Sequence, residues 1–170
     1  EATVPVLLLP DGDVFDESWE IVKWALSQND PDNWTGDNDE YLLEADILIE
    51  TNDFSFKVDL DHYKYADRYP EHTPEHYRIA CERFIEELED LLANNDYLLT
   101  DRPTLADIGV FPFVRQFSLV DKVGFERSPY PEVRNWLTGL LESELFRQTF
   151  QKHKTWEPGD EPVYLRCRSD

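Results

Sequence analysis

The two cysteines, Cys81 and Cys167, carry the most reactive side chains in this sequence of 170 residues. A cysteine thiolate can act as a nucleophile, bind a metal ion or enter a disulfide. The two residues lie far apart in the sequence and in unlike contexts, which argues against a disulfide framework and against a metal site. Cys81 falls within a helical stripe of apolar residues, so we expect it to be a small core residue.

A second group with chemical potential is the run Asp16, Glu17 and Ser18. It directly precedes apolar residues at the three- and four-residue spacings of an amphipathic helix: Trp19, Ile21, Val22, Ala25 and Leu26. Side-chain oxygens at this place can accept hydrogen bonds from the free backbone N–H groups of the first turn. We therefore expect these three residues to cap the helix.

The elements around this run predict a small N-terminal unit. Val4-Pro5-Val6-Leu7-Leu8-Leu9 reads as a strand, Pro10-Asp11-Gly12-Asp13 as a turn, and Val14-Phe15 as the returning strand. The helix that follows ends before Asn29. A hairpin and one helix cannot bury their own apolar faces, so this unit must pack on the rest of the chain. We expect it to span residues 1–28, with a linker over 29–38.

Residues 39–170 read as an all-helical domain. Helices are expected over about 39–50, then through Phe56, Leu60 and Tyr63 after a break near Asn52-Asp53, with Pro70 closing the pair. The clearest stripe runs from Pro74 to Leu92. Thr104-Leu105-Ala106-Asp107 predicts a capping box that opens a helix bent at Pro112. Two more helices follow, through Trp136 and through Phe146, and the tail from Thr155 is expected to be irregular.

Composition limits the partners. Sixteen Lys and Arg stand against 37 Asp and Glu, a formal net charge of −21, so the surface repels polyphosphates and nucleic acid is not an expected partner. We interpret the acidity as a solvated surface, with a saline habitat or a basic partner as alternatives. No apolar run is long enough for a bilayer span, and the start lacks the regions of a signal peptide. A cytoplasmic protein without a membrane partner is expected.

Several of these segments together resemble the glutathione transferase family. Val4-Pro5-Val6-Leu7 followed by Asp16-Glu17-Ser18 resembles the second half of the family's thioredoxin-like domain. Thr104-Leu105-Ala106-Asp107-Ile108 resembles the capping box of its helical domain, and the segments 63–69 and 111–117 are similar to bacterial members, expected to be of the Cys type. The resemblance implies a mostly α fold: a partial thioredoxin-like β-β-α segment followed by an all-α C-terminal domain.

The resemblance also implies a glutathione site. Pro5 would be a cis-proline, and the backbone of Val4 would pair with the cysteinyl part of glutathione as an added strand does. Ser18 and its backbone amide at the helix N-terminus would receive the γ-glutamyl carboxylate, and Glu17 would receive the ammonium group. An ordinary trans proline and plain helix capping are the alternative interpretations of these residues.

An apolar co-substrate would lie against the helical domain, where Tyr63, Phe111, Arg115 and Trp156 are the candidate wall residues. Aromatic side chains in a helical domain are more often core than ligand wall, so core packing is the alternative.

The sequence departs from the family at its start. The opening strand, helix and strand, with the Cys, Ser or Tyr that activates the glutathione sulfur, have no counterpart here, and neither cysteine occupies that position. No catalytic residue is therefore assigned. We favour a truncated piece of a glutathione-conjugating or thiol-transferring enzyme, and a homodimer is expected from the family. A naturally shortened binding protein, a strand edge completed by a second copy, and a non-catalytic scaffold or protein-interaction module are the alternatives.

Overall fold

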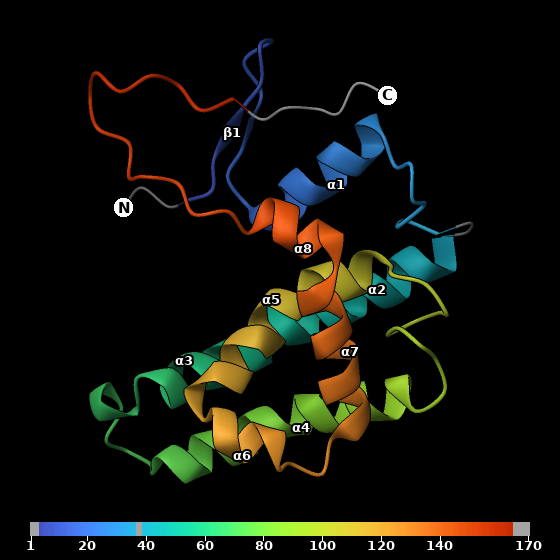
Figure 1. Ribbon diagram of the computed structural model, residues 1–170, viewed down its shortest axis with the longest axis vertical. Coiled ribbons are helices and arrows are strands. Elements are labelled where there is room, and N and C mark those ends of the chain that lie inside the picture. The colour runs from blue at the N-terminus through green and yellow to red at the C-terminus, as the bar shows by residue number, and fades with distance from the viewer. Residues whose placement is uncertain (1–3, 37–38, 165–170) are drawn as a thin grey trace.

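The computed structural model describes residues 4–36 and 39–164, and Figure 1 shows a short hairpin and one helix at one end of a helical body. Residues 37–38 of the expected linker and 165–170 of the expected helical domain lie outside the described residues. The elements, in chain order, are β1 (Leu7–Leu8), β2 (Val14–Phe15), α1 (Ser18–Gln28), α2 (Asp39–Thr51), the π-helical turn η1 (Asn52–Phe56), α3 (Lys57–Lys64), the 3-10 turn η2 (Ala66–Arg68), α4 (Pro74–Leu92), α5 (Leu105–Val120), α6 (Lys122–Glu126), α7 (Pro131–Glu142) and α8 (Glu144–Thr149). The mostly α fold class is confirmed.

The N-terminal hairpin forms where the sequence predicts it. β1 and β2 are antiparallel, with Leu7 opposite Phe15 and Leu8 opposite Val14. The backbone N–H of Leu9 donates to the carbonyl of Asp13 at 2.9 Å, and Gly12 turns the chain at a φ of 101°, which glycine tolerates because it has no Cβ. The expected capping of α1 is wrong, because its N-cap is Glu17 and no side chain bonds to the first-turn amides. Glutamate is not among the residues that favour this position.

The expected break at Asn52-Asp53 is also wrong. The chain stays helical from α2 through η1 into α3, and η1 absorbs one extra residue with wider π-type hydrogen bonding. Asn52 is fully buried there, and its Nδ2 donates to Asp53 Oδ1 at 2.9 Å. An Asn-Asp pair therefore marks a change of helix pitch here rather than a helix end.

The core is built around α4 and α5. α4 begins at Pro74, and the Thr73 side chain accepts a hydrogen bond from the His76 amide at 3.2 Å, as a good N-cap does. Its buried stripe includes Cys81, Ile85 and Leu88. α5 continues through Pro112 as one helix and buries most of its first turn. Together with residues of α2, η1, α3 and α7, these helices enclose a single cluster of buried apolar side chains.

The Asp107 carboxyl group accepts four hydrogen bonds within this core. The capping box with Thr104 is present, and Asp107 Oδ2 accepts from the Thr104 amide and hydroxyl, each at 2.8 Å. Its Oδ1 accepts from the Leu98 amide and from the Trp136 indole, each at 2.9 Å. Burial raises the pKa of Asp107, while these donated hydrogen bonds oppose that rise. The carboxyl group thus joins α5 to α7 and to the loop before α5.

The segment after α1 folds back on the start of α5. The Asp30 carboxylate accepts hydrogen bonds from the backbone amides of Trp34 and Thr35 and from the Thr35 hydroxyl. Burial opposes ionisation of Asp30, but these bonds prevail and lower its pKa. The amide of Leu105 then donates to the Trp34 carbonyl at 2.9 Å. This turn fixes where the first helix stands relative to the helical body.

Candidate functional site

The start of α1 presents free hydrogen-bond donors. Glu17 is the N-cap in an extended conformation, Ser18 is the first helical residue, and both are exposed. Because no side chain caps this end, the amides of the first turn can donate to a ligand, and the helix dipole favours an anion there. Val4 is 91% exposed, and the Val4–Pro5 peptide bond is cis, as the resemblance implies.

α1 is held on the helical body through Trp19. The indole Nε1 of Trp19 donates to Asp46 Oδ1 of α2 at 3.0 Å, and Trp19, Val22 and Leu26 pack against the core. On the α5 side the fit is close, because a Cβ built on Gly109 would lie 2.3 Å from Ile49 Cδ1 and 3.0 Å from Trp19 Cζ3. The expectation that the N-terminal unit packs on the rest of the chain is confirmed.

A small cavity of about 180 Å³ lies at this junction. Three elements line it: α1, the α2–η1 helix and α5. The lining residues are Ser18, Trp19, Val22, Ile49, Asp53, Ile108, Gly109, Pro112 and Phe113. The candidate glutathione residue Ser18 therefore faces a space that α5 closes on the other side.

A second space, which we call the apolar cavity, adjoins the first. It has a volume of about 400 Å³ and shares Ile108 and Pro112 with the small cavity. Its walls come mainly from α5 and α8, and its lining residues are Ile108, Phe111, Pro112, Arg115, Gln116, Leu140, Ser143, Leu145, Phe146, Thr149 and Phe150. Two of the four predicted co-substrate residues, Phe111 and Arg115, are thus brought together in the apolar cavity, which shares Ile108 and Pro112 with the small cavity that Ser18 lines.

Aromatic rings shape the apolar cavity. Phe146 of α8 packs edge-on against Phe111 at 5.5 Å between ring centroids and stacks on Phe150 at 4.7 Å. The guanidinium carbon of Arg115 lies 4.5 Å from the Phe150 ring centroid and 5.7 Å from that of Phe146. The sequence analysis missed Phe146 of α8 and Phe150, which directly follows α8, as wall residues, although it placed both on a helix. Only their contact with α5 distinguishes them from core residues.

The other two predicted wall residues lie elsewhere. Tyr63 lines a separate cavity of about 400 Å³ with Arg78, Glu82 and Phe117, and burial raises its pKa. Trp156 is 58% exposed in the segment after α8, where its indole donates to the Asp160 carbonyl at 3.2 Å. Neither residue is among those that line the apolar cavity.

Cys81 is placed as the sequence predicts. It is a free thiol with no exposed surface, and burial, followed by Asp59 and Glu82, raises its pKa to about 12. Cys167 lies outside the described residues. A thiol that stays protonated and inaccessible is a poor nucleophile, so Cys81 has the role of a core residue.

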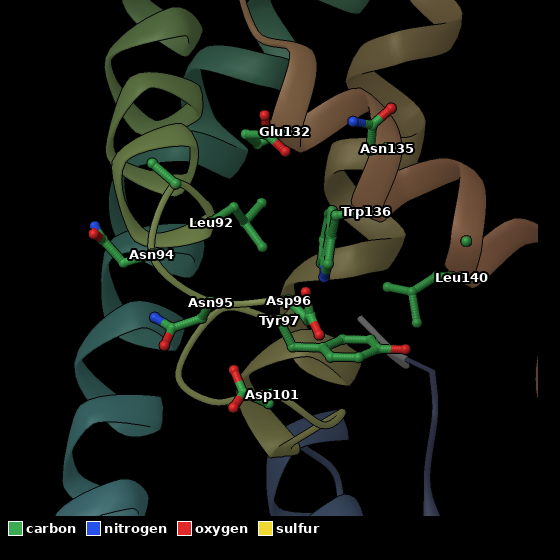
Figure 2. Close-up of a pocket in the computed structure, with 12 residues that line it drawn as sticks. Leu92, Asn94, Asn95, Asp96, Tyr97, Asp101, Glu132, Asn135, Trp136 and Leu140 are labelled. Atoms are coloured by element: carbon green, nitrogen blue, oxygen red, sulfur yellow. The ribbon is translucent and has the colours of Figure 1, made fainter.

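A larger polar space, which we call the acidic cavity, lies on another part of the molecule. Figure 2 shows side chains from the end of α4, the loop after it and α7 around this space of about 710 Å³. Asp96, Asp101 and Glu132 contribute carboxylates, and no Lys or Arg lines it. No local pattern in the sequence indicates this cavity, because its walls come from two separate segments, 92–101 and 132–140. It shares only Leu140 with the apolar cavity.

Among residues 4–36 and 39–164, no group of three or more His, Cys, Asp or Glu side chains could hold a metal ion. No helix in the same part of the chain is long and apolar enough to cross a membrane.

Comparisons with known proteins identify relatives of this fold. Residues 66–139 match the family described as glutathione S-transferase, C-terminal domain. A class Gtt2 glutathione S-transferase of Vibrio parahaemolyticus has a similar structure, with a TM-score of 0.69 and 19% identity over 86% of this chain and 72% of that chain. A glutathione S-transferase from Rhodospirillum rubrum gives a TM-score of 0.71 and 19% identity, covering 89% and 72%.

A third similar structure contains a ligand. It is a glutathione transferase from Phanerochaete chrysosporium in complex with oxidized glutathione, with a TM-score of 0.70 and 19% identity over 83% of this chain and 67% of that chain. No curated protein sequence matches this chain.

Proposed function

We propose that this chain, whose residues 66–139 match the glutathione S-transferase C-terminal domain family, binds glutathione at the start of α1 and an apolar electrophile in the adjoining apolar cavity. The complete protein would transfer the glutathione sulfur to that electrophile or exchange it with a disulfide. It would act in the cytoplasm, where the glutathione pool is kept reduced.

The proposed glutathione contacts follow the chemistry of the peptide. The α-carboxylate of the γ-glutamyl group is placed at the uncapped N-terminus of α1, with the Ser18 hydroxyl and amide as donors. Glu17 is placed against the ammonium group as an ion-pair partner. The exposed backbone of Val4 is placed beside the cysteinyl unit, where its donor and acceptor can pair with an extended peptide.

The observation that carries this proposal is that the two cavities share part of their walls. Ser18 lines the small cavity, and Ile108 and Pro112 line both that cavity and the apolar one. A glutathione molecule held at α1 would therefore direct its far end toward an apolar space of a size that suits a small organic molecule. Holding the two reactants side by side is itself a large part of catalysis of a bimolecular reaction.

We further propose a homodimer. An exposed apolar stripe runs along α2, η1 and α3, formed by Leu43, Ile47, Phe54 and Val58, and Phe54 is 82% exposed. Such a stripe on a helix is a feature of protein interfaces.

Titration with reduced glutathione tests the binding proposal. Fluorescence of Trp19 and Trp24, both on α1, reports on the site, and isothermal calorimetry gives the stoichiometry. We expect saturable binding that the double substitution Glu17→Ala, Ser18→Ala abolishes. The matched control is Glu20→Ala, Ser27→Ala, which removes the same side chains from later positions of α1 and should leave binding intact. A folded wild-type chain that does not bind glutathione would contradict the proposal and favour a scaffold.

A further inference from the structure

The apolar cavity contains a single charged side chain. Eleven of the described residues line it, and among these Arg115 alone carries a charge and none carries a carboxylate. This is unexpected in a chain where Asp and Glu outnumber Lys and Arg by 37 to 16. An apolar wall with one cation is the arrangement that a ligand with an apolar body and an anionic group requires.

Arg115 is available to such a ligand. Within residues 4–36 and 39–164 its guanidinium forms no ion pair and lies over the faces of Phe146 and Phe150. A guanidinium over an aromatic ring can keep N–H donors at its edge, and these can bind a carboxylate in a bidentate manner.

Most hydrogen-bonding groups of the neutral polar side chains around the cavity already have partners within the protein. Ser143 Oγ donates to the Leu140 carbonyl at 2.6 Å and accepts from the Phe146 amide at 3.1 Å. Thr149 Oγ1 donates to the Leu145 carbonyl at 2.8 Å, and Gln116 Oε1 accepts from Lys64 Nζ at 2.8 Å. The Gln116 NH₂ group remains as a neutral donor, and Arg115 is the only charged group among the described lining residues, so Arg115 is the group that can pair with an anionic substituent.

We propose that the apolar cavity selects aryl or alkyl carboxylates, whose carboxylate pairs with Arg115 and whose apolar body packs against Phe111, Leu145 and Phe146. This inference deepens the proposed function, because it names the class of ligand for the co-substrate cavity on which that function rests. It makes no use of glutathione, so it can be tested separately. The acidic cavity, which has three carboxylates and no cation, offers the same ligand no competing site.

The test compares two ligands of the same shape. Calorimetric titration at low salt uses 4-phenylbutyrate and its neutral analogue 4-phenylbutan-1-ol, both without glutathione. We expect the carboxylate to bind about tenfold more tightly, as a charge-assisted hydrogen bond in an apolar site implies. Equal binding of the two by the wild-type chain would overturn the proposal without any variant.

Substitutions test whether Arg115 causes the preference for the carboxylate. Arg115→Gln removes the charge and should reduce the affinity for 4-phenylbutyrate to that for the alcohol, whereas Arg115→Lys should keep part of the preference. The matched control Arg147→Gln removes a cation from α8 that does not line the cavity, and it should change neither affinity. Phe146→Ala should lower the affinities for the two ligands by the same factor. A preference that survives in a folded Arg115→Gln variant overturns the proposal.

The outcome also separates this inference from the proposed function. Carboxylate preference without glutathione binding would retain the anion site and refute the transferase proposal. Glutathione binding with no preference between the two ligands would refute the anion site alone.

Discussion

The indole Nε1 of Trp19 donates a hydrogen bond to Asp46 Oδ1 at 3.0 Å, and this bond ties the first turn of α1 to α2. Asp46 also forms an ion pair with Lys23 at 3.7 Å. The end of α1 that we propose for glutathione is therefore positioned by a residue that immediately follows Ser18. We therefore expect a substitution that breaks this hydrogen bond to lower both the stability of the protein and its affinity for glutathione.

Replacing Trp19 by Phe tests that connection. Trp19→Phe keeps an aromatic ring but loses the donor, and we expect it to lower the free energy of unfolding by about 1 kcal/mol, the net value of one such bond. Glutathione affinity should fall with it. Urea unfolding followed by circular dichroism measures the first effect. Trp24→Phe is the control, since the Trp24 indole has no hydrogen-bond partner among the described residues. Equal losses in the two variants would show that ring size, not the hydrogen bond, matters.

Gly109 sets how closely α5 approaches α1 and α2. A methyl group there would meet Ile49 Cδ1 at 2.3 Å and Trp19 Cζ3 at 3.0 Å, so side chains must shift. We expect Gly109→Ala to destabilise the protein by about 1–3 kcal/mol, the usual cost of overpacking. Gly139→Ala, in α7 with nothing within 4 Å, should instead stabilise by up to about 1 kcal/mol, because alanine is the better helix former. Opposite signs in thermal unfolding are the expected result, and equal shifts would contradict it.

Local patterns predicted most of the fold because they act over a few residues. The Pro10–Gly12 turn, the Pro74 start of α4 and the Thr104–Asp107 capping box each depend on near neighbours, and the structure has them. The failures have different origins. Asn52 is buried within a continuous helical stretch where its sequence favours a break, and α6 is too short for a periodic pattern to reveal.

The sequence also predicted the candidate site only in part. Helix periodicity placed Phe111 and Arg115 on one helix, but it could not show that Phe146 and Phe150, some 35 residues later, complete the wall around them. Tyr63 and Trp156 carry equally suitable rings and lie elsewhere. Side-chain type indicates what a residue can bind, whereas the partners across the cavity are set by how α5 and α8 pack.

Asp107 shows how such a non-local contact can be measured. Each of its carboxylate oxygens accepts two hydrogen bonds, so Asp107→Asn must present an NH₂ group to two donors whichever way the amide turns. We expect a loss of about 2–4 kcal/mol, since buried donors are left without acceptors. Asp101→Asn, an exposed carboxylate nearby, should change stability by less than about 0.5 kcal/mol. A mild effect at position 107 in urea unfolding would show that the network is not a main support of the core.

The apolar stripe on α2, η1 and α3 gives the dimer proposal a direct test. Phe54→Glu places a charge on the most exposed residue of the stripe, and we expect it to shift the protein from dimer to monomer in sedimentation velocity. Val123→Glu makes a comparable change at an exposed residue of α6 and should leave the dimer intact. A wild-type protein that sediments as a monomer at micromolar concentration would refute the homodimer.

Cys81 should be inert in the native protein. Its pKa is raised to about 12 by burial and by the nearby carboxylates Asp59 and Glu82, so little thiolate exists at pH 8. In a Cys167→Ser background, an aromatic disulfide reagent should react with Cys81 only as fast as the protein unfolds, and at once in denaturant. Rapid reaction of the folded protein at pH 8 would contradict the buried placement.

The difference between the pKa values of Cys81 in the folded and unfolded states predicts how the stability of the protein changes at alkaline pH. The unfolded thiol has a pKa of about 8.5, so above that pH the unfolded chain loses the proton first, and the free energy of unfolding falls progressively until the pH reaches the folded value of about 12. Tyr130, whose pKa burial and neighbouring glutamates also raise to about 12, acts in the same direction. Urea unfolding at several pH values from 8 to 10 gives the free energy of unfolding as a function of pH. The difference between the slopes of this dependence for wild type and Cys81→Ala is the contribution of Cys81. The wild-type slope should be the steeper one, and parallel slopes would show that the thiol titrates alike in both states.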